Sequence, residues 1–405
     1  MKQKRLLSIS LLAGLCLMIG CTITNRERDA NKAFYDRLYA DAIEDYKSLV
    51  DEKFEKKDKS YIIYLLNYAL INYYAGYFEE ARKSFWAAYE VGEGRIPSAT
   101  KAFQWLMPEH ERIYRLTKRE TALLHFYLGM SYLLSESIDD ALIEFKKIRL
   151  IEEQEPKIPL LSFYMGKAYE IAGEYGDAVV EYRTLNELAG DQSQSIAYLE
   201  LTKAYHLKGE AKQSIEYAQK FSSFMGSADS SVNVDSLIPD NSYELIVQID
   251  QDIMIDRCVI YADEEYIGEA QLYDRFDPGF TIGEGVREVI KETTSYAARK
   301  GIGYFLRKLF WGEADSIEVK EIEKSDERAW YYAPKGFSLF IGFIPKDTES
   351  VSIDFFVPDI PFLRSGSERV WGVTYDLSST PCVALGDHVF LTVRYQSKPY
   401  GTLRQ

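Results

Sequence analysis

A recurring order of small and aromatic residues in the first half of the chain limits the possible folds more than any other feature. In one copy, Gly129 is followed by Tyr132, then by a turn, then by Ala141 and Phe145. The second small residue of the pattern recurs at Ala42, Ala81, Ala141, Ala178 and Ser214, at intervals of 39, 60, 37 and 36 residues. Such a period is produced by pairs of helices that stack on their neighbours and bury a shared core.

The pattern resembles the tetratricopeptide repeat, in which a pair of helices recurs about every 34 residues. The resemblance implies that small side chains let paired helices approach closely and that the aromatic fills the space toward the next pair. Gly76, Gly173 and Gly209 stand where the first helix of a pair ends, and glycine suits the left-handed cap expected there. We predict repeats over residues 29–225, with a half unit around Ala42 and an insertion at 92–120. The alternative is an irregular helical bundle.

The first helices of such a stack line a concave face. We predict that this face binds a peptide or helix of a partner protein. The alternative is that its aromatic members form core between the repeats. The residues expected to line the face are Tyr73, Tyr74, Phe126, Met130, Phe163, Lys167, Glu170, Lys203 and His206.

The second half of the chain changes its period. Residues 226–242 are rich in Ser, Asp and Asn and predict a linker. From Tyr243 onward, apolar residues alternate with polar ones, which is typical of half-buried antiparallel strands. Val351, Ile353, Phe355 and Val357 share one face, as do Val389, Leu391, Val393 and Tyr395. The fold class is therefore multidomain, with an all-α tetratricopeptide-like solenoid followed by an α+β domain (243–405) that has a mainly antiparallel sheet.

The amino terminus predicts export and lipid attachment. A basic start is followed by an apolar run, residues 6–19, that is shorter than the roughly 20 residues that span a bilayer. Residues 1–20 therefore fit a signal peptide. Residues 18–21, Met-Ile-Gly-Cys, resemble a bacterial lipobox, which implies that Cys21 becomes the lipid-modified first residue, followed by a tether over 21–28. The alternative is an ordinary signal peptide with a chance cysteine. Thr22 in place of Asp favours the outer membrane.

Charge and cysteine content exclude several classes of site. The net charge of −15 disfavours nucleic acid as a partner. Cys258 and Cys382 could form a disulfide in an oxidising compartment, and the alternative is two buried free thiols. The chain contains neither HExxH nor CxxC, so we expect no metal site, and nothing predicts a cofactor.

A second resemblance lies in the C-terminal half. Asp326, Arg328, Trp330 and Pro334 form a motif that follows a basic helix candidate at 284–310 and precedes a strand. The motif resembles one in a little-characterised family of bacterial lipoproteins with helical repeats, as do segments 109–112 and 139–148. The resemblance implies a role in the cell envelope and no established activity. We interpret Asp326 and Arg328 as a structural, hydrogen-bonded corner. The basic helix candidate is expected to cover the sheet, and the alternative is that it lies on anionic lipid.

Motifs for catalysis are incomplete. Ser98 and Lys101 have the spacing of a penicillin-binding nucleophile without its accompanying elements. Asp387 and His388 are adjacent, but the chain has no GxSxG nucleophile. We therefore predict a non-catalytic, membrane-tethered scaffold in the bacterial envelope, periplasmic or surface-facing, that binds another envelope protein. The alternatives are binding of a glycan or small ligand by the C-terminal domain and an unrecognised envelope enzyme.

Overall fold

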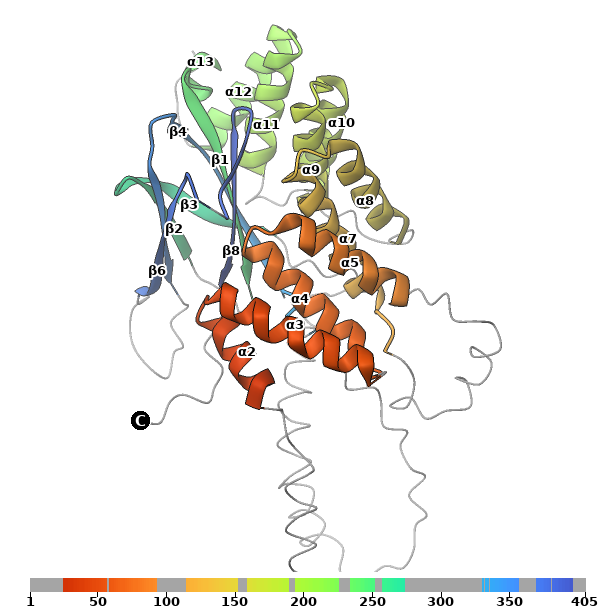
Figure 1. Cartoon of the computed structure of the whole chain (residues 1–405). Helices are drawn as coiled ribbons and strands as arrows, with labels where there is room; N and C mark the ends of the chain where they lie inside the picture. Colours follow the sequence, from red (N-terminus) through yellow and green to blue (C-terminus); the bar gives the residue numbers. More distant parts are fainter. Residues whose placement is uncertain are drawn as a thin grey trace, which may run out of the picture.

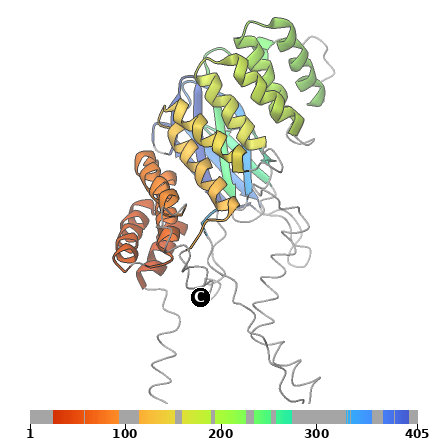
Figure 2. The same cartoon turned by 90° about the vertical axis from the view of Figure 1, so that its right-hand side faces the viewer.

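The first half of the chain forms five pairs of antiparallel helices. The computed structural model describes residues 25–56, 58–92, 114–151, 159–188, 194–225, 234–251, 257–273, 330, 332–334, 336–356, 369–379 and 381–395. The pairs are α2 (Asn25–Tyr35) with α3 (Tyr39–Glu55), α4 (Tyr61–Tyr74) with α5 (Phe78–Gly92), α7 (Lys118–Leu133) with α8 (Ile138–Ile151), α9 (Pro159–Ile171) with α10 (Tyr175–Leu188), and α11 (Gln194–Leu207) with α12 (Ala211–Phe224). Successive pairs contact one another, so the helices stack from α2 at one end to α12 at the other (Figure 2).

The turn inside each pair has the same conformation in all five pairs. Five residues before the second small residue of the pattern, the backbone φ is positive: Gly76, Gly173 and Gly209 lie at 81°, 76° and 81°. The prediction of left-handed caps at these glycines is confirmed. Arg37 and Glu136 occupy the same place in the other two pairs at 62° and 60°, a region that side chains with a Cβ seldom adopt. The expected half unit is therefore a complete pair, because α2 precedes α3.

Close packing inside the pairs explains the first small residue of the pattern. A Cβ at Gly129 would lie 2.5 Å from the ring of Phe145, and a Cβ at Gly166 would meet the ring of Tyr182. Each aromatic ring thus lies directly over the glycine of its own pair. Another aromatic at this place, Phe85, stacks on Tyr127 of the next pair at 6.1 Å between ring centroids.

The second half of the chain forms a sheet that is mainly antiparallel. Its strands are β1 (Ser242–Gln251), β2 (Arg257–Ala262), β3 (Glu265–Tyr273), β4 (Gly336–Pro345), β5 (Ser350–Phe356), β6 (Arg369–Asp376), β7 (Val383–Leu385) and β8 (His388–Tyr395). Their order is β6-β5-β2-β3-β4-β1-β8-β7, and among the described pairings only β1 with β8 is parallel. One end of β3 pairs with β2 and the other end with β4, so the sheet has two halves.

The two faces of β1 and β8 enter different cores. Leu245, Val247 and Ile249 join Val389, Leu391, Val393 and Tyr395 in a core shared with Val351, Ile353 and Phe355. The alternation predicted for these strands is confirmed within the described residues. On the opposite face, Ile246, Phe337 and Phe390 belong to one continuous core with the helices. The sheet therefore lies against the helical stack, with β1 and β8 close to the helices (Figure 1).

Several predicted segments lie outside the described residues: the lipobox at 18–21, most of the insertion, the helix candidate at 284–310, and both Asp326 and Arg328. Other boundaries differ slightly from the sequence-based ones. Helix α2 begins at Asn25, inside the expected tether, and the short helix α13 (Val234–Leu237) lies inside the expected linker. None of the helices in the described ranges combines the length and the apolar composition that crossing a bilayer requires.

Candidate functional site

A row of polar side chains crosses the buried face that the sheet presents to the helices. In β1, alternate residues Glu244, Gln248 and Asp250 point the opposite way from the apolar residues between them. The parallel register with β8 places Glu244 opposite His388 and Asp250 opposite Arg394. Ile246 and Phe390 lie opposite each other between these pairs. The interface thus has charge at two ends and an apolar middle.

The first of these ends, the ionic pole, joins α9 and α11 to β1 and β8. It consists of Lys167, Glu170, Glu200, Lys203, Glu244 and His388, all of them buried. Lys167 Nζ donates to Glu200 Oε2 at 2.5 Å and to Glu244 at 2.7 and 2.8 Å. Lys203 Nζ lies 2.7 Å from Glu170 Oε1 and also donates to Glu244. His388 Nδ1 is 2.6 Å from Glu244 Oε2.

Each carboxylate of the ionic pole responds to its neighbours differently. Burial disfavours the charge on Glu244, but Lys167 and Lys203 outweigh burial and hold the pKa of this carboxyl well below its usual value. Burial and the charge of Glu244 raise the pKa of Glu200 to about 7. Glu200 Oε1 is also without a hydrogen-bond partner, so it is the least stabilised carboxylate of the pole. The charges of the three carboxylates and the two ammonium groups balance when Glu200 carries a proton.

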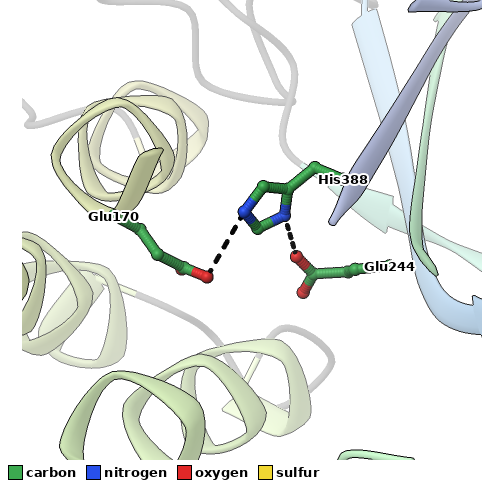
Figure 3. A group of neighbouring side chains, drawn as sticks. All are labelled: Glu170, Glu244 and His388. Carbon is green, nitrogen blue, oxygen red and sulfur yellow. Dashed lines mark hydrogen bonds and ion pairs between the residues drawn. The ribbon is translucent and has the colours of Figure 1, made fainter. Parts of the chain in front are cut away.

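Three members of the ionic pole have the types and spacing of metal ligands. One ligand atom each from Glu170, Glu244 and His388 lies within 4.8 Å of the others. Figure 3 shows the imidazole between the two carboxylates, with Glu170 on a helix and the other two on strands. However, Lys203 Nζ already binds both carboxylates. A divalent cation would have to replace this ammonium, so the arrangement fits an internal ion network better than a metal centre.

The other end, the tyrosine pole, stabilises a single carboxylate with hydroxyl groups. Tyr74 and Tyr127 donate to Asp250 Oδ2 at 2.5 and 2.6 Å, and Gln248 donates to Oδ1 at 2.6 Å. Burial raises the pKa of Asp250 to about 6 in spite of these donors. The guanidinium of Arg394 lies 5.4, 5.7 and 6.0 Å from the ring centroids of Phe34, Tyr74 and Tyr332, so aromatic faces surround the cation.

The structure brings most of the predicted concave lining together, beneath the chain's own strands. Tyr73 bonds to Thr392 of β8 at 3.0 Å, and Phe126 packs on Phe337 of β4 at 5.5 Å between ring centroids. Tyr74 binds Asp250, and Lys167, Glu170 and Lys203 belong to the ionic pole. Met130 and Phe163 are buried core residues, whereas His206 is exposed. Binding of a partner at these nine residues stays a prediction that would require displacement of the sheet.

Sequence reasoning missed the strand side of this interface. The strand residues Glu244, Asp250, His388 and Arg394 were not expected to be functional, and neither was Glu200 of α11; Asp387-His388 was noted only as a dipeptide. The feature that could have revealed these residues is the alternation of charged and apolar residues in strands that are buried on both faces. One face of an antiparallel sheet is commonly solvated, so the charged residues were interpreted as lying at the surface.

The two cysteines are free thiols in the structure. Cys258 is buried and Cys382 is half-buried, and both pack against the second core. Burial raises the pKa of each thiol to about 12, which makes both poor nucleophiles at neutral pH.

Trp330 of the predicted motif is buried among the repeats. Its ring lies 6.2 Å from that of Phe85 and 6.4 Å from that of Tyr127. Its backbone N–H donates to Glu120 at 2.7 Å, and Glu120 also closes a capping box with Thr117 at the start of α7. The described part of the motif therefore serves to attach the C-terminal half of the chain to the helices.

Comparison with known proteins gives no family for this chain and only distant structural neighbours. No protein-family model matches the chain, and no curated protein matches it. Among solved structures, MamA is 16% identical, with 51% of this chain and 96% of that chain covered and a TM-score of 0.35. YrrB, described as a TPR protein with an unusual peptide-binding site, is 15% identical over 49% of this chain and 84% of its own, with a TM-score of 0.35. A tetratricopeptide repeat protein from Parabacteroides merdae is 14% identical over 54% and 73%, with a TM-score of 0.39. The chain's own five helix pairs and their shared turns make its first half a tetratricopeptide-like repeat.

Proposed function

We propose that this chain is a lipid-anchored scaffold of the bacterial cell envelope, and that it binds another protein through the outward surfaces of its helical repeats. The sheet covers the concave face, where Tyr73, Lys167 and Lys203 bind strand residues. A partner therefore has the outer faces and the ends of the stack available to it. This closure of the concave face by the chain itself is the observation that carries the proposal.

Exposed apolar side chains on the second helices support the proposal. Ile143 of α8 and Val180 of α10 each stand two residues after the second small residue of the pattern, which is Ala141 in α8 and Ala178 in α10. They are 52% and 57% exposed. Both side chains occupy the same position of adjacent repeats and are exposed, so each is available for contact with a partner protein on the outward surface of the second helices.

The polar clusters support a non-catalytic role. The lysines, glutamates and histidine of the ionic pole bind one another across the interface, and all are buried. Asp250 is likewise bound by Tyr74, Tyr127 and Gln248. These groups stabilise the contact between sheet and helices, and a substrate would have to separate the two to reach them.

The anchor rests on the lipobox resemblance at Cys21. Attachment of the protein and its partner to one membrane would raise their encounter frequency without additional contacts, through effective concentration. The anchor is tested separately from binding: Cys21→Ser should abolish incorporation of labelled palmitate and release the protein from the membrane fraction. Persistence of this variant in membranes would contradict the anchor.

The test of binding is capture of the full-length lipidated protein from cross-linked membranes, comparing the wild type with the double variant Ile143→Asp and Val180→Asp. Deletion of the repeats is unsuitable, because it would expose Glu244 and Asp250 and unfold the sheet. The matched control is Tyr266→Asp, an equally exposed apolar residue on β3. We expect one set of proteins to be lost with the double variant and retained with the control. The same catch with all three proteins would contradict the proposal.

A further inference from the structure

The last helix pair exposes positions that the third and fourth pairs bury. Leu142 of α8 and Val179 of α10 directly follow the second small residue of the pattern, and their side chains are 6% and 3% exposed. Ile215 of α12 occupies the same position and is 45% exposed. Six residues further along, Ile148 and Leu185 are fully buried, whereas Phe221 is only half-buried. The difference arises because a further pair follows α8 and α10, while α12 ends the stack (Figure 2).

The contacts between earlier pairs define what covers this surface. Lys146 and Arg183 stand five residues after the second small residue of the pattern. Their charged groups lie 5.7 Å from the ring centroids of Tyr169 and Tyr205, respectively, in the first helix of the following pair. Eight residues after the same small residue, Arg149 donates to Ser162 of the following first helix at 3.5 Å. Tyr89 packs on His125 in the same way, at 4.8 Å between ring centroids.

The same positions in α12 are Ile215, Gln219 and Ser222, which share one helix face by their spacing. Phe224 lies on the other side of α12, where its ring packs on Tyr198 of α11 at 6.5 Å between ring centroids. The short helix α13 contacts α11 and α12 but leaves Ile215 exposed. We call Ile215, Gln219 and Ser222 the terminal stacking face.

We infer that the terminal stacking face binds an amphipathic helix of the partner protein, which packs on α12 as the first helix of a sixth pair would. The occupant follows from continuity, because the interface between successive pairs is built by the same positions in α5, α8 and α10. Its chemistry also follows: apolar side chains to cover Ile215, with a polar or tyrosine side chain opposite Gln219. This inference rests on the proposed function and specifies the class of partner.

The test uses a synthetic, end-capped and fluorescently labelled peptide of residues 194–207, the helix that packs on α10, as the probe. Its binding to the full chain is measured by fluorescence anisotropy. We expect Ile215→Asp to weaken binding at least tenfold and Gln219→Arg to strengthen it severalfold, because the arginine would reproduce the contact of Arg183 with Tyr205. The matched control, Tyr266→Asp on β3, should leave binding unchanged.

The inference would be overturned by the absence of saturable binding, by equal losses with Ile215→Asp and Tyr266→Asp, or by no gain with Gln219→Arg. Sedimentation of the wild type decides the competing occupant: a dimer that Ile215→Asp dissociates would assign the face to a second copy and overturn the inference. Capture of a partner that depends on Ile143 and Val180 but not on Ile215 would leave the proposed function standing while this inference fails.

Discussion

The ionic pole and the tyrosine pole each stabilise a carboxylate of β1 that is buried against the helices, but they do so with different groups. At the ionic pole, Glu244 is bound by two lysines and a histidine. At the tyrosine pole, Asp250 is bound by hydroxyl and amide donors, with Arg394 nearby. The pKa of Glu244 is consequently lowered, whereas that of Asp250 is raised.

This difference shows that positive charge offsets the unfavourable burial of a carboxylate more than the number of hydrogen bonds does. Three donors leave Asp250 with a raised pKa, while two ammonium groups reverse the effect of burial at Glu244. The two poles should therefore respond oppositely to pH. They should also differ in the cost of losing the central carboxylate, because removal of Glu244 leaves two buried cations without their shared partner.

The largest expected effect is the loss of the carboxylate at the ionic pole. Glu244→Ala should lower the free energy of unfolding by about 3–5 kcal/mol, because it leaves Lys167 and Lys203 buried with incomplete compensation. Urea titration followed by circular dichroism measures the change. The matched control is Glu265→Ala, an exposed glutamate on β3, which should change stability by no more than about 0.5 kcal/mol. Equal small effects for both would show that Glu244 is not buried in the ion network.

The next effect separates the poles by pH. The pKa of Asp250 rises from 3.8 to about 6 on folding, so the folded state keeps a proton that the unfolded state releases between these values. The stability of the wild type should therefore fall by about 2 kcal/mol between pH 4 and pH 6, relative to Asp250→Asn. Unfolding free energies across this range provide the measurement.

A control of opposite sign is available for this pH dependence. Backbone hydrogen bonds from Glu349 and Ser350 lower the pKa of the exposed Asp263. Its contribution is present above the unfolded pKa and is lost as pH falls through the lower folded value. Asp263→Asn should therefore remove stability at neutral pH and not near pH 2. A pH dependence of the same sign for both variants would contradict the assignment of Asp250 as a buried, weakly compensated carboxylate.

A smaller effect tests the helix packing beneath the ionic pole. Gly166→Ala should lower the free energy of unfolding by about 1–3 kcal/mol, because the new methyl group meets the ring of Tyr182, which also binds Glu170. Gly176→Ala in α10 is the control: no atom lies within 4 Å of the new methyl group, so stability should stay constant or rise by up to about 1 kcal/mol. Thermal unfolding of both variants distinguishes packing from helix propensity.

The smallest effect concerns the turn between α7 and α8, away from both poles. Glu136 is exposed and has a φ of 60°, so Glu136→Gly should raise the free energy of unfolding by about 0.5 kcal/mol through relief of backbone strain. Gly173→Ala, at the equivalent position of the next pair, should lower it by about 1 kcal/mol. Destabilisation by Glu136→Gly would mean that the glutamate side chain makes a contact worth more than the strain.

The sequence was sufficient to predict the structural elements that are determined by residues close to one another in the chain. The pattern from Gly166 through Gly173 to Tyr182 encodes a close helix contact and a turn, and the structure has both. Alternation in residues 387–395 encodes a strand with one apolar face, and Val389, Leu391 and Val393 lie on it. These features depend on residues that are close in the sequence, so they can be predicted from a single sequence.

The interface could not be predicted in the same way, because it depends on distant partners. Lys167 and Glu244 are 77 residues apart, and Tyr73 and Thr392 are 319 apart. Lys167 and Tyr73 were expected on a concave face, but nothing local indicates that these residues meet β1 and β8. A charged residue in a strand has the same local signature whether it faces water or a buried lysine, so Glu244 and Asp250 were missed.

The central claim is that the sheet closes the concave face of the repeats, and a double-mutant cycle between the two halves of the chain tests it most directly. Lys203→Met, Glu244→Gln and their combination would be compared with the wild type by urea unfolding. We predict a coupling energy of about 2 kcal/mol, because the two groups contact each other in the folded state. Additive effects, with a coupling energy within about 0.3 kcal/mol of zero, would contradict the claim and leave the concave face open to a partner.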